Sequence, residues 1–187
     1  MLSDILDYTR TLLKEVIPPG GTAVDATAGN GHDTLFLARC TGDSGSVYAF
    51  DIQEAAIEKT KKRLEEADLH AHVIQDGHEN AASYIKEAAI DAAVFNLGYL
   101  PGSDKSVTTS SATTIKAVSG LLEKLKPGGR IVLVVYHGHQ EGALEKAELL
   151  PFMETLPQDQ FRVLRYQFIN QRNSPPFIIA AEKRQVW

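Results

Sequence analysis

Cysteine is almost absent from this sequence, since Cys40 is the only one among 187 residues. A single cysteine cannot form an intramolecular disulfide, and it excludes a zinc site built from several cysteines. Long apolar runs are also missing, because no run approaches the roughly 20 residues that a helix needs to span a bilayer. These absences favour a protein of a reducing, cytoplasmic compartment with no membrane partner.

An excess of positive charge is the second missing feature. The sequence has 19 basic and 24 acidic residues, a net charge of −5 with neutral histidines. A uniformly basic nucleic-acid binder is thereby excluded, and any contact with RNA must come from a local patch. Hydrophobic residues make up 43% and charged residues 23% of the chain, which is ordinary for a globular protein. We expect a single domain over residues 1–187.

Apolar segments of strand type alternate with segments of helical periodicity. The predicted strands lie at residues 22–25, 46–50, 72–75, 90–95 and 130–136. The predicted helices cover residues 3–16, 54–67, 80–87 and 111–125, with another that begins at Asp33 or Thr34 and one in the segment 137–156. Two alternating segments joined by the polar turn Asn170–Ser174 close the chain as a hairpin. The pattern predicts a doubly wound α/β fold whose mostly parallel sheet gains one antiparallel strand from the hairpin.

A glycine loop follows the first predicted strand and opens the next helix. Gly29 and Gly31 would let the backbone turn sharply and approach a ligand. Asp51 lies twenty residues beyond Gly31, at the end of the next strand, where an acid typically accepts hydrogen bonds from ribose hydroxyls. The pattern therefore indicates a nucleoside cofactor; the alternative is a plain strand-to-helix turn with a solvated acid.

Two residues distinguish between nucleoside cofactors. A dinucleotide site has a third glycine where this sequence has Thr34. Asp25, just before the loop, would repel a pyrophosphate but would favour a cationic amino-acid group. A nicotinamide-dependent oxidoreductase is therefore disfavoured, although it stays open as an alternative.

The run D-A-T-A-G-N-G from Asp25 to Gly31 resembles the first motif, [DE]-x-G-x-G-x-G, of class I S-adenosyl-L-methionine-dependent methyltransferases. Thr27 replaces the first glycine. The resemblance implies a Rossmann-like fold with a seven-stranded sheet in the order 3-2-1-4-5-7-6. It also implies a set of cofactor-binding residues that surround the methionine part, the ribose and the adenine, namely Asp25, Thr27, Gly29, Asn30, Gly31, Asp51, Ile52, Gln53, Asp76, Gly77, His78 and Asn96.

The end of the fourth predicted strand, Asn96-Leu97-Gly98-Tyr99, resembles the N-P-P-Y motif of amine methyltransferases, without its two prolines. This resemblance implies that Asn96 orients a target amine and that Tyr99 stacks on a planar base. The runs NLGYLPGSDKSVTT and DATAGNGHDT together resemble a family of small bacterial methyltransferases formerly labelled rRNA methylases. Members of that family are associated with methylating the aminomethyl group of a wobble uridine, so 5-aminomethyl-(2-thio)uridine in the tRNA anticodon loop is the implied substrate.

Residues after the fourth and fifth strands complete the predicted site. We expect His137 to accept the released proton, as a catalytic residue beside Asn96 and Tyr99. We expect the acceptor base or RNA to be held by Lys105, Thr108, Thr109, Tyr136 and His139. His137 and His139 form an H-x-H pair, but no third ligand is near in sequence, so no metal is expected.

The remaining basic residues indicate where RNA would dock. A local patch is predicted near the C-terminal hairpin, from Arg162, Arg165, Arg172, Lys183 and Arg184. A homodimer that joins two such patches is a further hypothesis. The sequence is also compatible with a methyltransferase that acts on rRNA or a small-molecule amine, and with a non-catalytic RNA-binding protein.

Overall fold

Strand β1 (Thr22–Asp25) is an interior strand of the sheet, and all four of its residues are buried. It pairs in parallel with β2 (Ser46–Asp51) on one side and with β4 (Ile90–Leu97) on the other. Burial on both faces explains why these strands read as apolar runs. The structure is a computed structural model that describes residues 1–98 and 109–185.

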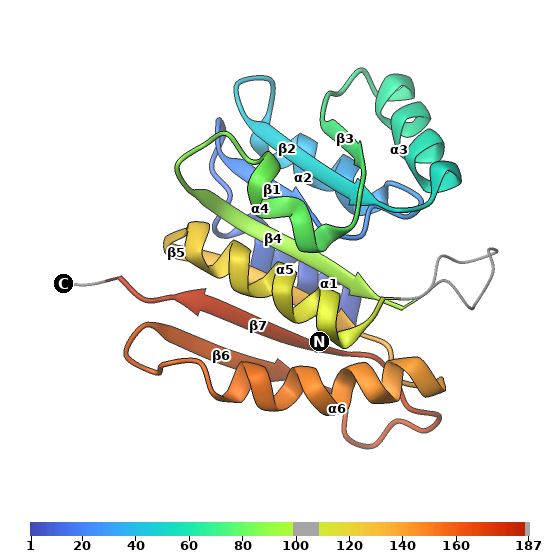
Figure 1. Ribbon diagram of the computed structural model, residues 1–187, viewed down its shortest axis with the longest axis vertical. Helices are drawn as coiled ribbons and strands as arrows, with labels where there is room; N and C mark the ends of the chain where they lie inside the picture. Colours follow the sequence, from blue (N-terminus) through green and yellow to red (C-terminus); the bar gives the residue numbers. More distant parts are fainter. Residues whose placement is uncertain (99–108, 186–187) are drawn as a thin grey trace.

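Within the described residues, seven strands form one sheet in the order β3-β2-β1-β4-β5-β7-β6 (Figure 1). β7 runs antiparallel to its neighbours β5 and β6, whereas β1 to β5 pair in parallel. The remaining bounds are β3 (His72–Gln75), β5 (Leu125–Val135), β6 (Phe161–Tyr166) and β7 (Phe177–Lys183). The predicted fold class, strand order and single antiparallel strand are confirmed.

Helices cover both faces of this sheet. Leu12, Leu37 and Leu64 anchor α1, α2 and α3 in an apolar cluster on one face, and Leu121 and Leu149 anchor α5 and α6 on the other (Figure 1). The bounds are α1 (Ile5–Lys14), α2 (His32–Thr41), α3 (Glu54–Glu66), η1 (His78–Asn80), α4 (Ala81–Tyr84), α5 (Ser111–Lys124) and α6 (Gln140–Glu154).

Two predicted elements differ from the structure. The helix expected over residues 80–87 shrinks to η1 and α4, because Ile85 has extended backbone and its side chain is buried in the core. The strand expected over residues 130–136 starts five residues earlier, as β5. That strand begins at Leu125 and carries an irregularity between its pairs with Ile90 and Ala92.

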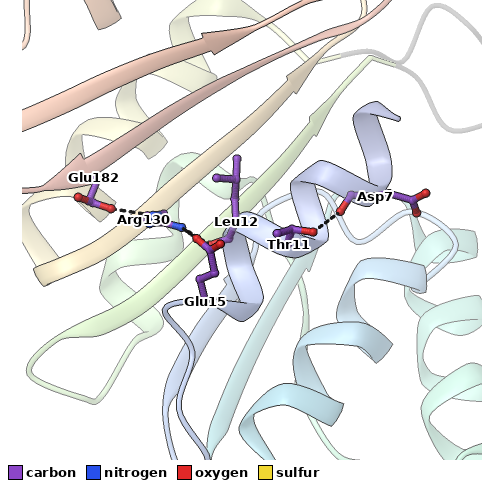
Figure 2. A network of polar contacts seen from close by, with 6 residues as sticks. All are labelled: Asp7, Thr11, Leu12, Glu15, Arg130 and Glu182. Atoms are coloured by element: carbon purple, nitrogen blue, oxygen red, sulfur yellow. Dashed lines mark hydrogen bonds and ion pairs between the residues drawn. The ribbon is translucent and has the colours of Figure 1, made fainter. Parts of the chain in front are cut away.

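Arg130 fixes helix α1 against the sheet (Figure 2). Its guanidinium donates from Nε to Glu182 of β7 at 2.8 Å and from Nη1 to the Leu12 carbonyl oxygen at 3.0 Å. The same Nη1 forms an ion pair with Glu15, the residue that caps the carboxyl end of α1. Since these contacts hold one end of α1, they also position the rest of the helix, whose Arg10 side chain lines a cavity at the edge of the sheet.

Candidate active site

A cavity of about 1000 Å³ opens where the parallel strands end. Ligands of open α/β sheets bind at this edge, which faces right in Figure 1, where β4 ends. Most of the predicted site residues line the cavity, namely Thr27, Gly29, Asn30, Asp51, Ile52, Gln53, Asp76, Gly77, His78, Asn96, Thr109, Tyr136 and His139. These predicted residues follow or end the five strands β1 to β5, and they meet at one cavity.

Asp51 holds the glycine loop as well as facing the cavity. Its Oδ2 accepts from the Gly29 N–H at 3.0 Å, and its Oδ1 accepts from the Gln53 N–H at 2.9 Å. Gly29 has a φ of 54°, a left-handed conformation that glycine adopts without strain. The carboxylate thus connects the loop after β1 to the end of β2, where a ribose would lie.

Asp25 occupies a different place from the one expected. It is fully buried behind the loop and is not among the residues that line the cavity. Its Oδ2 accepts from the Thr34 hydroxyl at 2.6 Å, and its Oδ1 accepts from the Thr27 N–H at 3.1 Å. Burial, and then the nearby charge of Asp33, raises the pKa of Asp25 to about 7. Asp25 therefore supports the loop from behind and does not line the cavity.

Gly31 also acts through packing. It lies at the N-cap of α2 with a φ of 80°, and it does not line the cavity. A Cβ at this position would lie 2.9 Å from the Thr60 Cα of α3. Arg63 of α3 adds a hydrogen bond of 2.8 Å from Nε to the Asn30 carbonyl oxygen. The close approach of α3 therefore supports the loop and requires glycine at position 31.

The loop after β3 forms one end of the cavity. Hydrogen bonds lower the pKa of Asp76, and the largest effect comes from the Tyr84 hydroxyl, which donates at 2.7 Å. His78 Nδ1 lies 3.1 Å from the Ala26 carbonyl oxygen, which requires Nδ1 to be the donor. Burial lowers the pKa of His78. Asp76 thus presents a carboxylate and His78 a ring tied to the backbone of the first loop.

Asn96 is held at the end of β4 by a residue of the glycine loop and a residue of α2. Its backbone N–H donates to the Thr27 hydroxyl at 2.7 Å, so the threonine in place of the motif glycine has a structural use. Its side-chain Nδ2 donates to Asp33 of α2. The amide lies on the cavity wall, close to the glycine loop.

Sequence reasoning missed Asp33 and Arg10, which also line the cavity. Burial raises the pKa of Asp33, while the charges of Arg10 and His32 act in the opposite direction. Arg10 Nε is buried and has no hydrogen-bond partner within the described residues. The only sequence signal for Asp33 was its position just after the G-x-G pattern, because its partner Asn96 is 63 residues away in sequence.

The two histidines after β5 have different surroundings. His139 Nδ1 accepts from the Gly142 N–H at 2.8 Å and caps α6, so the proton of the neutral ring is on Nε2. His137 Nε2 donates to the Pro175 carbonyl oxygen at 2.9 Å, and His137 is not among the lining residues. Contrary to expectation, His137 lies outside the cavity wall because this contact and its ring packing on Phe177 hold it toward β7.

Glu145 of α6 anchors the start of helix α5. Its side chain is 2% exposed and accepts from the hydroxyls of Thr109 at 2.7 Å and Thr114 at 2.6 Å. Burial raises the pKa of Glu145. Thr109 is thereby fixed at the cavity, while the predicted residues Tyr99, Lys105 and Thr108 lie outside the described residues.

Within residues 1–98 and 109–185, no group of three or more His, Cys, Asp or Glu side chains is arranged to hold a metal ion. In the same part of the chain, no helix combines the length and the apolar character needed to cross a bilayer.

The sheet order, the glycine loop and the acid at the end of β2 define a class I S-adenosylmethionine-dependent methyltransferase fold. A family model described as "Putative rRNA methylase" matches residues 47–182. The chain belongs to this methyltransferase family.

Similar proteins agree with this assignment. The chain is 37% identical over 183 residues to the chloroplastic tRNA (mnm(5)s(2)U34)-methyltransferase of Arabidopsis thaliana, a match that covers 92% of the chain and 67% of the relative. A Clostridium thermocellum structure described as an rRNA methylase shares 42% identity and a TM-score of 0.96, covering 98% and 99% of the two chains. A Streptococcus mutans methyltransferase structure in complex with S-adenosylhomocysteine (SAH) shares 42% identity and a TM-score of 0.90, with the same coverage.

Proposed function

We propose that this protein transfers a methyl group from S-adenosylmethionine to the amine of 5-aminomethyl-(2-thio)uridine at the wobble position of tRNA. The observation that carries the proposal is the Asn96 amide, which faces the same cavity as the glycine loop held by Asp51. The similarity to the plant tRNA methyltransferase supports the choice of substrate, and the SAH complex of the Streptococcus relative supports the choice of cofactor.

In the proposed binding mode, Asp51 accepts hydrogen bonds from the ribose hydroxyls. Ile52 and Gln53, next to Asp51 on the cavity wall, would contact the adenine, with Asp76 at its edge. A carboxylate there suits the exocyclic amine, which is a donor. The methionine part would lie against the backbone of residues 27–30, closest to Asn96.

The acceptor would lie between Asn96 and the residues after β5. The uncharged amine attacks the methyl carbon, the carbon–sulfur bond breaks with its electron pair on sulfur, and neutral SAH and a secondary ammonium are formed. The ammonium then releases one proton to water. Because the sulfonium is already activated, the protein mainly has to align the amine and exclude water. Asn96 Oδ1 can accept from the amine, and His139 Nε2–H can donate to a carbonyl oxygen of the base.

Nucleoside mass spectrometry tests the proposal. Purified protein with S-adenosylmethionine should convert the 5-aminomethyl form in tRNA to the 5-methylaminomethyl form, and tRNA from cells without the gene should keep the unmethylated form. Asn96→Ala should lower the rate about 100-fold through misalignment while the affinity for SAH stays within about threefold. Unchanged wobble nucleosides would contradict the substrate assignment.

Ribosomal RNA is the second candidate substrate, because the family description names it. Digests of rRNA from the same two strains separate the candidates: a methylated nucleoside lost from rRNA alone would favour this one. Titration with NADH and with S-adenosylmethionine tests the oxidoreductase alternative, which requires NADH to bind more tightly.

A further inference from the structure

Asp33 is an acid on the cavity wall that takes no part in the methyl transfer as proposed above. Its carboxylate accepts from Asn96 Nδ2. An ionised carboxylate has only acceptor atoms, so it accepts from the nitrogen side of the amide. This contact turns Asn96 Oδ1 away from Asp33, and Oδ1 is the atom that can accept from an amine.

Charged and titratable groups near Asp33 come from α1, α2, β1 and the segment after β5. Arg10 of α1 and His32 of α2 are the nearby cationic or titratable bases, and Asp25 of β1 is a second acid. Tyr136, after β5, also feels the charge of Asp33. Burial raises the pKa of Asp33 even though the charges of Arg10 and His32 lower it. A cation bound in the cavity would therefore stabilise the charged form of Asp33, which burial disfavours.

We propose that Asp33 is the positioning and specificity-determining residue for a cationic primary amine: its carboxylate orients the Asn96 amide and attracts the ammonium form of the acceptor into the cavity. The inference rests on the proposed function and deepens it. A primary alkylamine is mostly protonated at neutral pH, so binding through its charge concentrates it beside the methyl donor. It then loses one proton to water before the neutral nitrogen attacks.

Binding without turnover provides the main test. The SAH complex of the whole protein is titrated with the nucleosides 5-aminomethyluridine and 5-hydroxymethyluridine, which have similar size but differ in charge. We expect the wild type to prefer the amine about 10- to 100-fold, as a charge-assisted contact provides. Asp33→Asn should reduce this preference to less than about threefold while SAH affinity stays within about twofold.

Two further variants control for folding. Asp43→Asn removes the same charge from an exposed position after α2 and should keep the full preference for the amine. Asp33→Glu keeps the charge on a longer side chain and should retain part of the preference, which covers the case in which Asp33→Asn does not fold. A wild type without preference, or an Asp33→Asn variant that keeps it, would overturn the inference.

A kinetic readout separates positioning from a merely structural role. With tRNA as substrate, the increase in KM caused by Asp33→Asn should shrink as the pH rises toward the pKa of the amine, because the acceptor loses its charge. A defect that stays constant with pH would contradict the inference. If the wild type prefers the amine and Asp33→Asn loses this preference, but tRNA is not methylated, the proposed function fails and the role of Asp33 stands. If tRNA is methylated but Asp33→Asn keeps the preference, the proposed function stands and the role of Asp33 fails.

Discussion

At the scale of single residues, Asp51 combines two uses in one side chain. It orders the glycine loop through Gly29 and would bind the cofactor ribose. We therefore predict that Asp51→Ala weakens binding of S-adenosylmethionine about 10- to 100-fold, since hydrogen bonds to a charged group contribute about 1.5–3 kcal/mol. Isothermal titration calorimetry measures the change. An affinity within about twofold of the wild type would place the ribose elsewhere.

Asp25 gives the fold a defined pH dependence. Its pKa is about 7 in the folded protein and about 4 in an unfolded chain. Between these values the unfolded chain releases a proton that the folded protein keeps, so this residue lowers stability as the pH rises. Asp25→Asn should therefore be less destabilising at about pH 8 than at about pH 5. Urea unfolding at both pH values measures this, and Asp43→Asn, which changes an exposed acid, should show no such trend.

Gly31 is predicted to tolerate no side chain. A Cβ there would lie 2.9 Å from the backbone Cα of Thr60, and the φ of 80° disfavours other residues. We expect Gly31→Ala to lower the free energy of unfolding by about 2–4 kcal/mol. Gly128 is a matched control, because it has a similar φ of 82° and its nearest neighbour is only the flexible end of Gln185. Gly128→Ala should cost about 1–2 kcal/mol, and equal losses for both would remove packing as the cause.

At the scale of elements, Arg130 links α1 to β5 and β7 (Figure 2). Its side chain is 19% exposed, whereas that of Lys62 in the surface pair with Glu66 is 76% exposed. Arg130→Met should destabilise the protein by about 1–3 kcal/mol, and Lys62→Met by no more than about 0.5 kcal/mol. Hydrogen exchange should also become faster in α1. Unchanged exchange there would show that apolar packing alone holds the helix.

The boundaries of elements mark where sequence reasoning ended. Continuous apolar runs were sufficient to predict β1, β2 and β4, because strands buried on both faces have a strong signal. The start of β5 and the shortness of α4 depend on contacts with distant residues, such as the pairing of Leu125 with Ile90. No local pattern encodes such pairings.

At the scale of the whole molecule, the same limit applies to the site. Residues in recognisable motifs, such as Asp51 and Asn96, were predicted to lie at one edge and do so. Asp33 was not predicted, because its place in the site depends on a hydrogen bond with Asn96, which is 63 residues away in sequence. His137 was assigned to the cavity on sequence position alone, although its neighbour His139 is the one that faces it.

The sheet register also divides the basic residues of the hairpin into two groups. Phe177 pairs with Val135 at the carboxyl end of β5, so the loop 167–176 with Arg172 lies at the cavity edge, where Ser174 lines the wall (Figure 1). Arg162 pairs with Glu182 near the opposite edge. Both arginines are exposed, and replacing either by alanine changes the net charge of −5 by the same amount. The two substitutions are therefore matched in charge and differ only in position.

This division predicts that RNA binds at one end of the hairpin only. Arg172→Ala should raise the KM for tRNA about fivefold and reduce the slope of log KM against log salt concentration by about 0.7, as expected for one lost phosphate contact. Arg162→Ala should change KM by less than about twofold. Initial rates at several salt concentrations measure both effects, with the affinity for S-adenosylmethionine as the control. Equal effects of the two substitutions would mean that RNA is attracted by net charge, since a phosphate contact at the cavity edge would involve Arg172 alone.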